Sequence, residues 1–600
     1  MANKLFKIRE KINLYIFDSK ANILKILSFI TVIITVFVMA GTIRYYGFPE
    51  TEATYKYNYL IIRISLVYFL IRYLILLFYD FHPLEFIKRR WFEGIILFLF
   101  FFDALFPRVF ESVFIISSLK EIVRTHTLLL FQLYFLIIVF LEISHTASRL
   151  AKLKIGPAAL LALSFVTLIF SGAGLLMLPE MTTGHHFRFL DAVFTATSAS
   201  CVTGLTVVDT ATFFTLKGKV IIMLLIQLGG INILSFAAFF VTLSRRTGGL
   251  KYQSIIKDLL SVEQLSDTRK ILRSIIKWSI LIELAGSILL FFSWEDVIPF
   301  KNEEGKIFSS VFHAISAFNN AGFSLFSDNL YEVGKHNLIG FQLIISLLVI
   351  TGGLGFFVLQ DLFGISNIRR RFNFKWKSYH VSTKITLRMS GILLLAGTII
   401  FFIIERNNTL SGKGFLDAAV VSFFQSVTTR TAGFNTVDIA SLSKPVLLLF
   451  LILMFIGAGS GSTGGGIKVS TFALTLRSAI STIRGKEHVD FFKRNIPYDI
   501  VNKAYTILIY ALSIIGISTF ALTITEPDTG FMKLVFEEVS AFATVGLSTG
   551  ITPHLSDAGR IIIILSMFVG RIGILSIAMI LSRKVISSKY KYAKSTIMVG

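Results

Sequence analysis

Charged residues and cysteine are both scarce in this chain. Of its 600 residues only 16% are charged, whereas 54% are hydrophobic and 60 are phenylalanine, and the mean hydropathy is +0.74. A soluble chain of this length carries more charge, so the composition excludes an ordinary soluble protein and indicates a protein of the lipid bilayer. No polar stretch is long enough to bury a core of its own, so no soluble domain is expected.

The single cysteine, Cys201, excludes an intramolecular disulfide framework and a cysteine-rich metal site. Nor do the repeats described below contain paired carboxylates, a histidine cluster or a nucleophile beside a base. The chain is therefore not expected to be an enzyme or to hold a cofactor, and a membrane enzyme is the weakest of the functional classes considered.

The formal net charge of +23 does not indicate a nucleic-acid partner, because the basic residues recur between apolar runs and form no single patch. Basic clusters in loops face the cytoplasm, and twelve spans would put all of these clusters on one side. We expect a multi-pass protein of the cell (inner) membrane with both termini cytoplasmic. The first apolar run is too long for a cleavable signal and reads as a retained span.

One short unit is repeated four times. The glycines Gly204, Gly322, Gly433 and Gly546 are separated by 118, 111 and 113 residues, and each has a phenylalanine ten positions before it and leucine or phenylalanine after it. Internal repeats fix the architecture before any local motif is read. Four copies predict four quadrants around one pore.

Apolar runs long enough to span a bilayer flank each glycine segment. They lie at about 156–179, 220–243, 275–294, 337–360, 383–404, 445–476, 504–525 and 561–582. The segment before each glycine is too short to cross and return as two helices, so we expect a half-helix followed by an extended return. Such backbone is tolerated at membrane depth where it lines water or is buried in protein.

The predicted fold is an all-α membrane protein with four pseudo-symmetric helix–pore-loop–helix repeats around one pore. About four more spans precede them, with apolar runs near 22–43, 59–79, 92–106 and 127–143. The expected division is a four-span extension over 1–150, a pore domain over 151–585 and a cytoplasmic tail over 586–600. The repeats are placed at about 151–245, 270–363, 383–480 and 503–585.

Extended backbone at four symmetric glycines offers rings of carbonyl oxygens that can replace the hydration shell of a monovalent cation. The four segments resemble the filter loops of the Trk/Ktr/HKT family of potassium transporters over about 156–585. They read Val202-Thr-Gly-Leu-Thr-Val-Val-Asp209, Phe318-Asn-Asn-Ala-Gly-Phe323, Thr428-Thr-Arg-Thr-Ala-Gly-Phe-Asn435 and Thr544-Val-Gly-Leu-Ser548. The resemblance implies a cation filter made of Val202, Thr203, Gly204, Asn320, Ala321, Gly322, Thr431, Ala432, Gly433, Thr544, Val545 and Gly546.

In that family glycine at all four positions accompanies potassium selectivity, and serine in the first loop accompanies sodium transport. All four are glycine here. The resemblance therefore implies potassium-selective uptake, with potassium bound at the filter as the only metal. It also implies a homodimer and a cytoplasmic ring of nucleotide-binding regulatory subunits. Whether uptake is passive or coupled to sodium stays open, as do a sodium-conducting transporter of the same architecture and a voltage-gated cation channel.

The run 445–476 is longer than a bilayer needs and must be broken, and its glycines mark the break. The resemblance implies an intramembrane gate loop here. The gate residues are Gly457, Gly459, Gly461, Gly464, Gly465, Gly466, Lys468 and Arg571. Arg571 is a lone charge in an apolar span, which is costly without a partner. Residues 459–464 also fit the Gly-x-Gly-x-x-Gly pattern, but they lack the strand–helix setting of a dinucleotide site.

Five other polar residues are candidates for a role near the filter. Asp209 and Asp438 either attract cations to the outer mouth or cap the turns that follow them. His313 is expected to pack within a pore helix, and Arg430 and Asn319 to brace the filter from behind. Position six before the glycine is serine in three repeats and Val427 in the third, so the quadrants are not expected to be equivalent.

Overall fold

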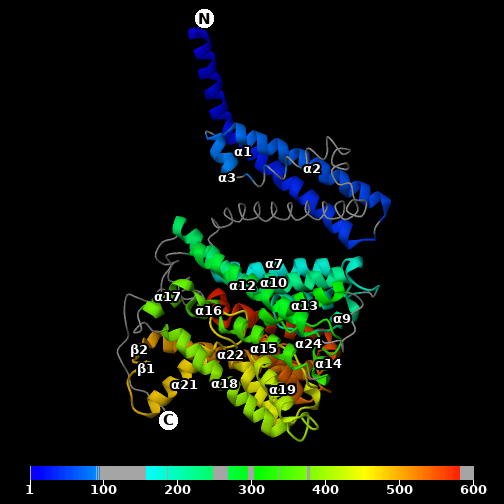
Figure 1. Cartoon of the computed structure of the whole chain (residues 1–600), viewed down its shortest axis with the longest axis vertical. Coiled ribbons are helices and arrows are strands. Elements are labelled where there is room, and N and C mark those ends of the chain that lie inside the picture. Colours follow the sequence, from blue (N-terminus) through cyan, green and yellow to red (C-terminus); the bar gives the residue numbers. More distant parts are fainter. Residues whose placement is uncertain are drawn as a thin grey trace. The chain divides into compact units, whose positions relative to one another are not determined.

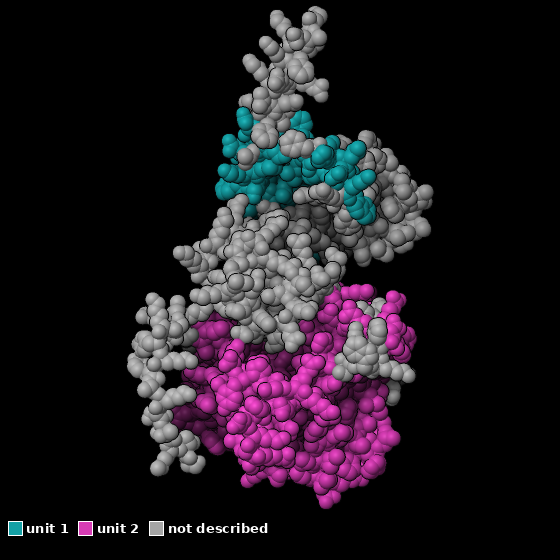
Figure 2. All heavy atoms as spheres, turned by 90° about the vertical axis from the view of Figure 1, so that its left-hand side faces the viewer, with its two compact units in different colours: residues 1–154, 178–180 teal, residues 155–177, 181–600 magenta. Residues whose placement is uncertain are grey.

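The computed structural model describes residues 2–49, 51–80, 82–89, 91, 94, 97, 157–184, 187–247, 268–294, 303–336, 338–373 and 379–581. The chain divides into two compact units, one of residues 1–154 and 178–180 and one of residues 155–177 and 181–600 (Figure 2). The expected spans near 92–106 and 127–143, and the tail 586–600, lie outside the described residues apart from Gly94 and Leu97.

The first unit contains a pair of long helices. Its described elements are α1 (Ala2–Gly47), α2 (Glu52–Phe78) and α3 (Pro83–Arg89). Their packing buries Val38, Phe69, Tyr73 and Leu97. The Thr31 hydroxyl lies 2.8 Å from that of Tyr68 and also donates to a backbone carbonyl of its own helix, so this buried hydroxyl is satisfied locally.

The second unit contains the four repeats, and each has a long helix, a short pore helix and a second apolar segment, which is divided into two helices in repeats two, three and four (Figure 1). The first repeat consists of α7 (Pro157–Leu176), α8 (Phe189–Ser200) and α10 (Leu216–Thr247), with η1 (Pro179–Met181) and α9 (Thr210–Phe213) between them. The second consists of α12 (Thr268–Ser293), α13 (Glu303–Phe318), α14 (Tyr331–Lys335) and α15 (Ile339–Leu354), continued by α16 (Phe356–Phe363) and α17 (Ile365–Asn373).

The third and fourth repeats follow the same plan. The third consists of α18 (Val381–Glu405), α19 (Phe415–Thr428), η2 (Ile439–Ser441), α20 (Lys444–Phe455) and α21 (Val469–Ile483). The fourth consists of α22 (Tyr498–Thr525), α23 (Phe531–Phe542), η3 (Thr552–His554), α24 (Asp557–Ile572) and α25 (Ile574–Leu581). An antiparallel hairpin of β1 (Val489–Phe491) and β2 (Arg494–Ile496) joins them.

Two expected spans are bent rather than straight, which corrects the sequence interpretation. The run 337–360 bends by 102° between α15 and α16, and the run 561–582 bends by 98° between α24 and α25. The break falls at Gly355 in one and Gly573 in the other, each with φ near +90°. Only glycine adopts that backbone readily, so a single residue ends one helix and starts the next.

The number of spans falls short of the expected twelve within the described residues. Five helices there are long and apolar enough to cross a membrane, or seven if each bent pair is one span. The second span of the third repeat is not among them, because α20 ends at Phe455 and α21 begins at Val469, which is where the sequence predicted a break. Its two pieces are short apolar helices.

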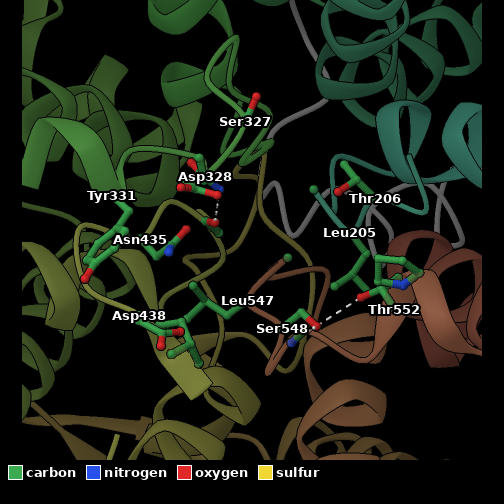
Figure 3. Close-up of a pocket in the computed structure, with 17 residues that line it drawn as sticks. Leu205, Thr206, Ser327, Asp328, Tyr331, Asn435, Asp438, Leu547, Ser548 and Thr552 are labelled. Atoms are coloured by element: carbon green, nitrogen blue, oxygen red, sulfur yellow. Dashed lines mark hydrogen bonds between the residues drawn. The ribbon is translucent and has the colours of Figure 1, made fainter. Parts of the chain in front are cut away.

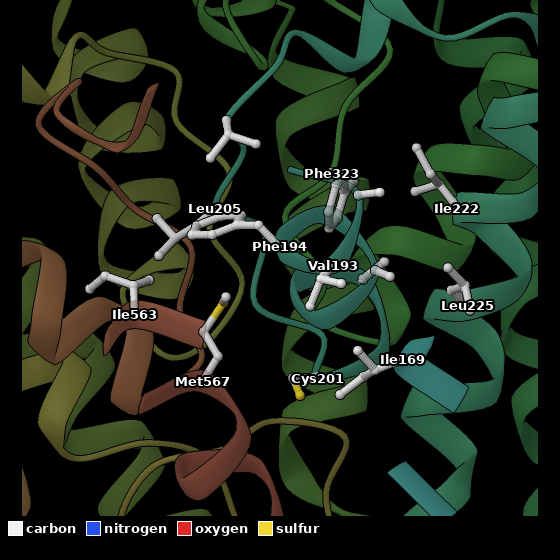
Figure 4. Packing of buried hydrophobic residues seen from close by; sticks show 14 of the residues in the cluster. Ile169, Val193, Phe194, Cys201, Leu205, Ile222, Leu225, Phe323, Ile563 and Met567 are labelled. Atoms are coloured by element: carbon white, nitrogen blue, oxygen red, sulfur yellow. The ribbon is translucent and has the colours of Figure 1, made fainter. Parts of the chain in front are cut away.

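The hydrophobic core joins neighbouring repeats rather than filling each one separately. Figure 4 shows Leu205 and Phe194 of the first repeat facing Ile563 and Met567 of α24 in the fourth, with Cys201 below them. The same cluster includes Phe323 of the second repeat. Two further clusters combine repeats two and three and repeats three and four. Packing of apolar side chains therefore runs through all four repeats.

Candidate functional site

The four glycines of the repeats form a closed ring. A Cβ atom added to Gly204 would lie 2.5 Å from the carbonyl oxygen of Ala321 and 3.1 Å from Cα of Gly322. The same relation recurs around the molecule: Gly322 faces Ala432 and Gly433, Gly433 faces Val545 and Gly546, and Gly546 faces Thr203 and Gly204. Each glycine thus abuts the next repeat, and the fourth repeat meets the first.

Glycine is required at these positions for two independent reasons. All four have positive φ, from +69° at Gly322 to +97° at Gly204. A side chain there would also run into the backbone of the next repeat, which cannot move aside as a flexible side chain can. The ring therefore brings together four sequence-predicted residues that lie more than 100 positions apart.

The residue two positions before each glycine is also left-handed. Val202, Asn320, Thr431 and Thr544 have φ between +50° and +73°. Non-glycine residues adopt this backbone rarely, and β-branched ones least of all, at a cost of about 1–3 kcal/mol each. No sequence pattern predicted this backbone, because valine and threonine disfavour positive φ. A strained turn repeated four times marks the loops as functional candidates.

Serine at the sixth position before the glycine holds three of the four loops. Its carbonyl accepts a 2.8 Å hydrogen bond from the residue before the glycine, donated by Thr203, Ala321 or Val545. The hydroxyls of Ser198 and Ser540 also accept from the glycine N–H at 3.1 Å, and that of Ser316 donates to the Phe323 carbonyl at 2.8 Å. Val427 offers no hydroxyl, so the expected inequality of the third repeat has a physical cause.

A cavity of about 370 Å³ opens against the ring and is lined by residues of all four repeats (Figure 3). Gly204, Gly433 and Gly546 form part of its wall, and its polar side chains include Asp328, Asn435 and Asp438. Asn329 donates to the carbonyls of Gly322 and Gly433, at 3.3 and 3.1 Å, and so joins the second and third loops.

The alternatives for the two aspartates resolve differently. Asp209 caps α9, because its carboxylate accepts from the Ala211 N–H at 2.9 Å and the Thr212 hydroxyl at 2.7 Å, and it does not line the cavity. Asp438 caps η2 through the Ala440 N–H at 3.0 Å and also lines the cavity. Of these two aspartates, Asp438 is the one that is placed to act on a cation in the cavity.

The glycine-rich segment 456–468 lies between the bend of the second repeat and the filter loops. Gly459 N–H donates to the Gly353 carbonyl at 2.8 Å, and Phe356 N–H donates to the Gly461 carbonyl at 3.1 Å. The sequence analysis did not predict that Gly353 and Phe356 contact the glycine-rich segment. Three glycines within four positions, at 352, 353 and 355, are nevertheless a sequence signal for the bend between α15 and α16. Close backbone approach of this kind needs glycine on both sides.

The same segment is bonded to three of the four filter regions. Thr463 donates its hydroxyl to the Phe318 carbonyl at the end of α13, at 3.3 Å. Gly465 N–H donates to the Thr544 hydroxyl at 3.1 Å, and Arg430 donates to the Gly457 carbonyl at 3.2 Å. The predicted gate residues are therefore gathered directly beside the predicted filter residues.

Two buried arginines and one half-buried lysine hold carbonyls of this segment. Arg571, 3% exposed, donates to the Thr463 carbonyl and, at 2.7 Å, to the Gly229 carbonyl of α10. Lys468 donates to Gly464 at 2.6 Å, and Arg430 donates to Gly457. None of the three has a carboxylate partner among the ion pairs of the described residues. Carbonyl dipoles alone offset these charges.

His313 and Asn319 are buried on the second pore helix and the turn after it. The His313 ring lies 2.8 Å from the Ser309 carbonyl and 3.1 Å from the Ser324 hydroxyl, so it packs, as expected. Asn319 bonds to side chains behind the loop. Within the described residues no group of three histidine, cysteine or acidic side chains could hold a metal ion.

Beside the cavity, charged residues connect the first and fourth repeats. Asp191 of α8 accepts from Arg188 at 3.0 Å and from Arg560 of α24 at 2.5 Å. Arg188 also pairs with Asp557 at 3.0 Å, and Arg560 donates to the carbonyl of Pro553, which lines the cavity. The carboxylates of Asp191 and Asp557 raise the pKa of Arg188 above its ordinary value, so this arginine stays charged.

Known cation transport proteins are similar to this chain in sequence. The family model TrkH, described as a cation transport protein, matches residues 160–592. The Ktr system potassium uptake protein B of Vibrio alginolyticus is 39% identical over 451 residues, covering 75% of this chain and 96% of that protein. Its counterpart in Bacillus subtilis (strain 168) is 41% identical over 447 residues, covering 74% and 97%.

A solved structure supports the fold independently of sequence. The potassium transporter TrkH from Vibrio parahaemolyticus matches with a TM-score of 0.59 at 17% identity, over 81% of this chain and 97% of that one. At that identity the match speaks for the fold alone. Together with the family match, it confirms the resemblance read from the four filter segments. This chain belongs to the TrkH family of cation transport proteins and is a multi-pass membrane transporter, not an enzyme.

Proposed function

We propose that this chain is the pore-forming subunit of a potassium uptake system and that its glycine ring is the selectivity filter. The observation that carries the proposal is the closed ring, in which the carbonyls of Thr203, Ala321, Ala432 and Val545 each abut the glycine of the neighbouring repeat. Carbonyl oxygens gathered around one axis can replace the hydration shell of a potassium ion. The names of the Ktr relatives support potassium as the ion.

The cavity against the ring is the proposed entrance. Asp328 and Asp438 give it negative charge, and Asn435 adds a neutral polar group. A concave, acidic site raises the local concentration of cations before they enter. Dehydration is then completed at the ring, where rigid backbone holds the oxygens in place.

The segment 456–468 is the proposed gate. It lies between the ring and the bend at Gly355, and the positive charges of Arg430, Lys468 and Arg571 surround it. A fixed positive charge on the pathway repels a permeating cation. Opening requires the segment to break its hydrogen bonds to the filter loops and to Arg571. The side chains of Arg430, Lys468 and Arg571 must then move with the segment or become hydrated.

Uptake needs no ATP site in this chain. An inside-negative potential of about 100 mV is worth roughly 2.3 kcal/mol per charge, which supports about fifty-fold accumulation of a monovalent cation. The voltage-gated alternative is not favoured, since the chain's family and relatives are uptake and transport proteins. Sodium as the conducted ion stays the second candidate within the same architecture.

The remaining parts of the proposal rest on the family match, which begins at residue 160, and on the apolar runs that precede it. Residues 1–150 form a separate four-span extension, and 151–585 form the pore domain. The protein is a homodimer of the inner membrane with both termini cytoplasmic, and a cytoplasmic ring of nucleotide-binding subunits controls it. Potassium, and sodium if uptake is coupled, are substrates, and no resident cofactor is assigned.

Ion flux into liposomes tests the proposal. Purified protein is reconstituted, and uptake of potassium, rubidium, sodium and lithium is compared at one imposed inside-negative potential. We expect potassium and rubidium to enter at least ten times faster than sodium or lithium. Equal rates for sodium and potassium would refute the potassium filter, and the absence of any cation flux would refute the pore.

A further inference from the structure

A second lone charge lies inside the membrane-spanning part of the chain, at Glu283 of α12. Its side chain is 7% exposed and has no basic partner among the ion pairs of the described residues. An ionisable group at membrane depth is costly and is kept where it has a task. The apolar run 275–294 that contains Glu283 carries one other charged residue, Lys277, near its start.

Two amide groups from different elements hold this carboxyl. Oε2 accepts from the side-chain amide of Gln227 of α10 at 3.0 Å, and Oε1 accepts from that of Asn319 at 3.1 Å. Asn319 Nδ2 also lies 2.8 Å from the Gln227 side-chain oxygen and 2.9 Å from the Ile315 carbonyl, so its two hydrogens are shared among three acceptors, and the three side chains form a triangle. Glu283 thereby ties the second helix of the first repeat to the second pore helix.

The donor and acceptor pattern requires an acceptor at both oxygens of Glu283. Gln227 and Asn319 each present an N–H₂ group to it, and an N–H₂ group can only donate. Glutamine at position 283 would place a donor against one of them. The backbone leaves no room to swing away, because a Cβ atom on Gly230 would already collide with Asn319 Oδ1.

Asn319 connects Glu283 and Gln227 to the second filter loop. It immediately precedes Asn320, the left-handed residue of the second loop, and its own side chain also donates to the Ile315 carbonyl at 2.9 Å. The Asn320 amide in turn faces the Thr431 hydroxyl of the third loop at 3.2 Å. A continuous line of contacts therefore leads from α10 and α12 through two neighbouring filter turns.

We propose that Glu283 is a positioning residue of the filter: its carboxyl fixes the turn at 319–321 against the first repeat and thereby sets the position of the Ala321 carbonyl. The inference rests on the proposed function of the glycine ring. Glu283 does not touch the ion. It acts through Asn319.

The test compares two buried carboxyls changed in the same way. Glu405, at the end of α18, is fully buried and accepts hydrogen bonds from Ser443, Asn408 and Thr409, none of which belongs to a filter loop. Glu283→Gln and Glu405→Gln are reconstituted in liposomes, and the ratio of potassium to sodium flux is measured with the thermal unfolding temperature of each. Glu283→Asp, which keeps two acceptor oxygens on a shorter stem, is included as the conservative variant.

We expect Glu283→Gln to lower the flux ratio at least five-fold, Glu283→Asp to recover most of it, and Glu405→Gln to leave the ratio within two-fold while lowering stability. A ratio unchanged in Glu283→Gln, or lowered equally in both glutamine variants, overturns the inference. If Glu283→Gln does not fold, Gln227→Met removes one of the two donors, and an unchanged ratio in that variant overturns the inference too. A wild-type protein without potassium preference refutes the proposed function instead, so the two failures are distinct.

Discussion

A single small side chain at Gly204 is enough to test whether the glycine ring is the selectivity filter. At Gly204 the backbone has φ +97°, and the space where a side chain would begin is filled by the Ala321 carbonyl and Gly322 Cα. Small changes there displace oxygens that the proposed filter must hold at a fixed distance from the ion. Selectivity is therefore expected to respond at the residue scale before overall stability does.

Serine at Gly204 should lower the preference for potassium over sodium about ten-fold. The reason is the combined cost of a left-handed side chain and the displaced carbonyl; a ten-fold change corresponds to about 1.4 kcal/mol between the two ions. The measurement is the potassium-to-sodium flux ratio in liposomes. Gly174→Ser in α7 is the control, because no described atom lies within 4 Å of a Cβ placed there. A wild-type ratio in Gly204→Ser would count against the filter assignment.

Neutralising Arg571 should increase potassium flux several-fold. Its guanidinium holds the Thr463 and Gly229 carbonyls, so glutamine in its place keeps one amide donor but removes the charge. A several-fold increase corresponds to about 1 kcal/mol less repulsion of a cation in the pathway. Initial rates of rubidium uptake into vesicles measure the effect. Flux equal to that of the wild type would mean that the carbonyls already neutralise the charge.

At the scale of elements, the proposed gate and its neighbours lie at breaks in helices, at 456–468, Gly355 and Gly573. The break in the third repeat was predictable, since six glycines in ten positions cannot remain helical at that length. The bends at Gly355 and Gly573 were not predicted, although glycines cluster there, at 352, 353 and 355 and at 570 and 573. Likewise, no sequence pattern assigned left-handed backbone to Val202 or Thr544, where tertiary packing overrides the preference of a β-branched residue.

Alanine at Gly355 should raise flux more than alanine at Gly573. Both glycines have φ near +90° at a bent helix, so both variants meet similar backbone strain. Only at Gly355 would the added Cβ press on the gate segment, 2.6 Å from the Ser460 carbonyl; around Gly573 no described atom lies within 4 Å. The difference in rubidium uptake between the two variants measures the effect of the contact with the Ser460 carbonyl, because the backbone strain is similar in both. Equal changes in both would show that the bend acts without the gate segment.

The whole molecule depends on the fourth repeat meeting the first. The sequence predicted four quadrants from their spacing along the chain, but spacing cannot say which repeats are neighbours or that the ring closes. The contacts of Gly546 with Thr203 and of Asp191 with Arg560 supply that closure. The repeat pattern located the four glycines, and the resemblance to the Trk/Ktr/HKT family implied the filter residues beside them, whereas the contacts of Glu283 emerged only when distant segments were placed together.

Loss of Arg560 should destabilise the protein more than loss of Arg188, although both donate to Asp191. The Arg560 side chain is 12% exposed and that of Arg188 is 49% exposed, so water screens the second pair far more than the first. We expect Arg560→Ala to cost about 1–3 kcal/mol and Arg188→Ala under about 1 kcal/mol. Thermal unfolding in detergent measures both. The reverse order would mean that this charge cluster does not close the ring of repeats.

The central claim is that four glycine loops, one from each repeat, form a potassium-selective ring. The most direct measurement is competition in vesicles that contain only the wild-type protein, with radioactive rubidium uptake followed in the presence of excess potassium, sodium or lithium. The account predicts that potassium suppresses rubidium uptake and that equal concentrations of sodium or lithium leave it nearly unchanged. Suppression by sodium as strong as that by potassium would contradict it.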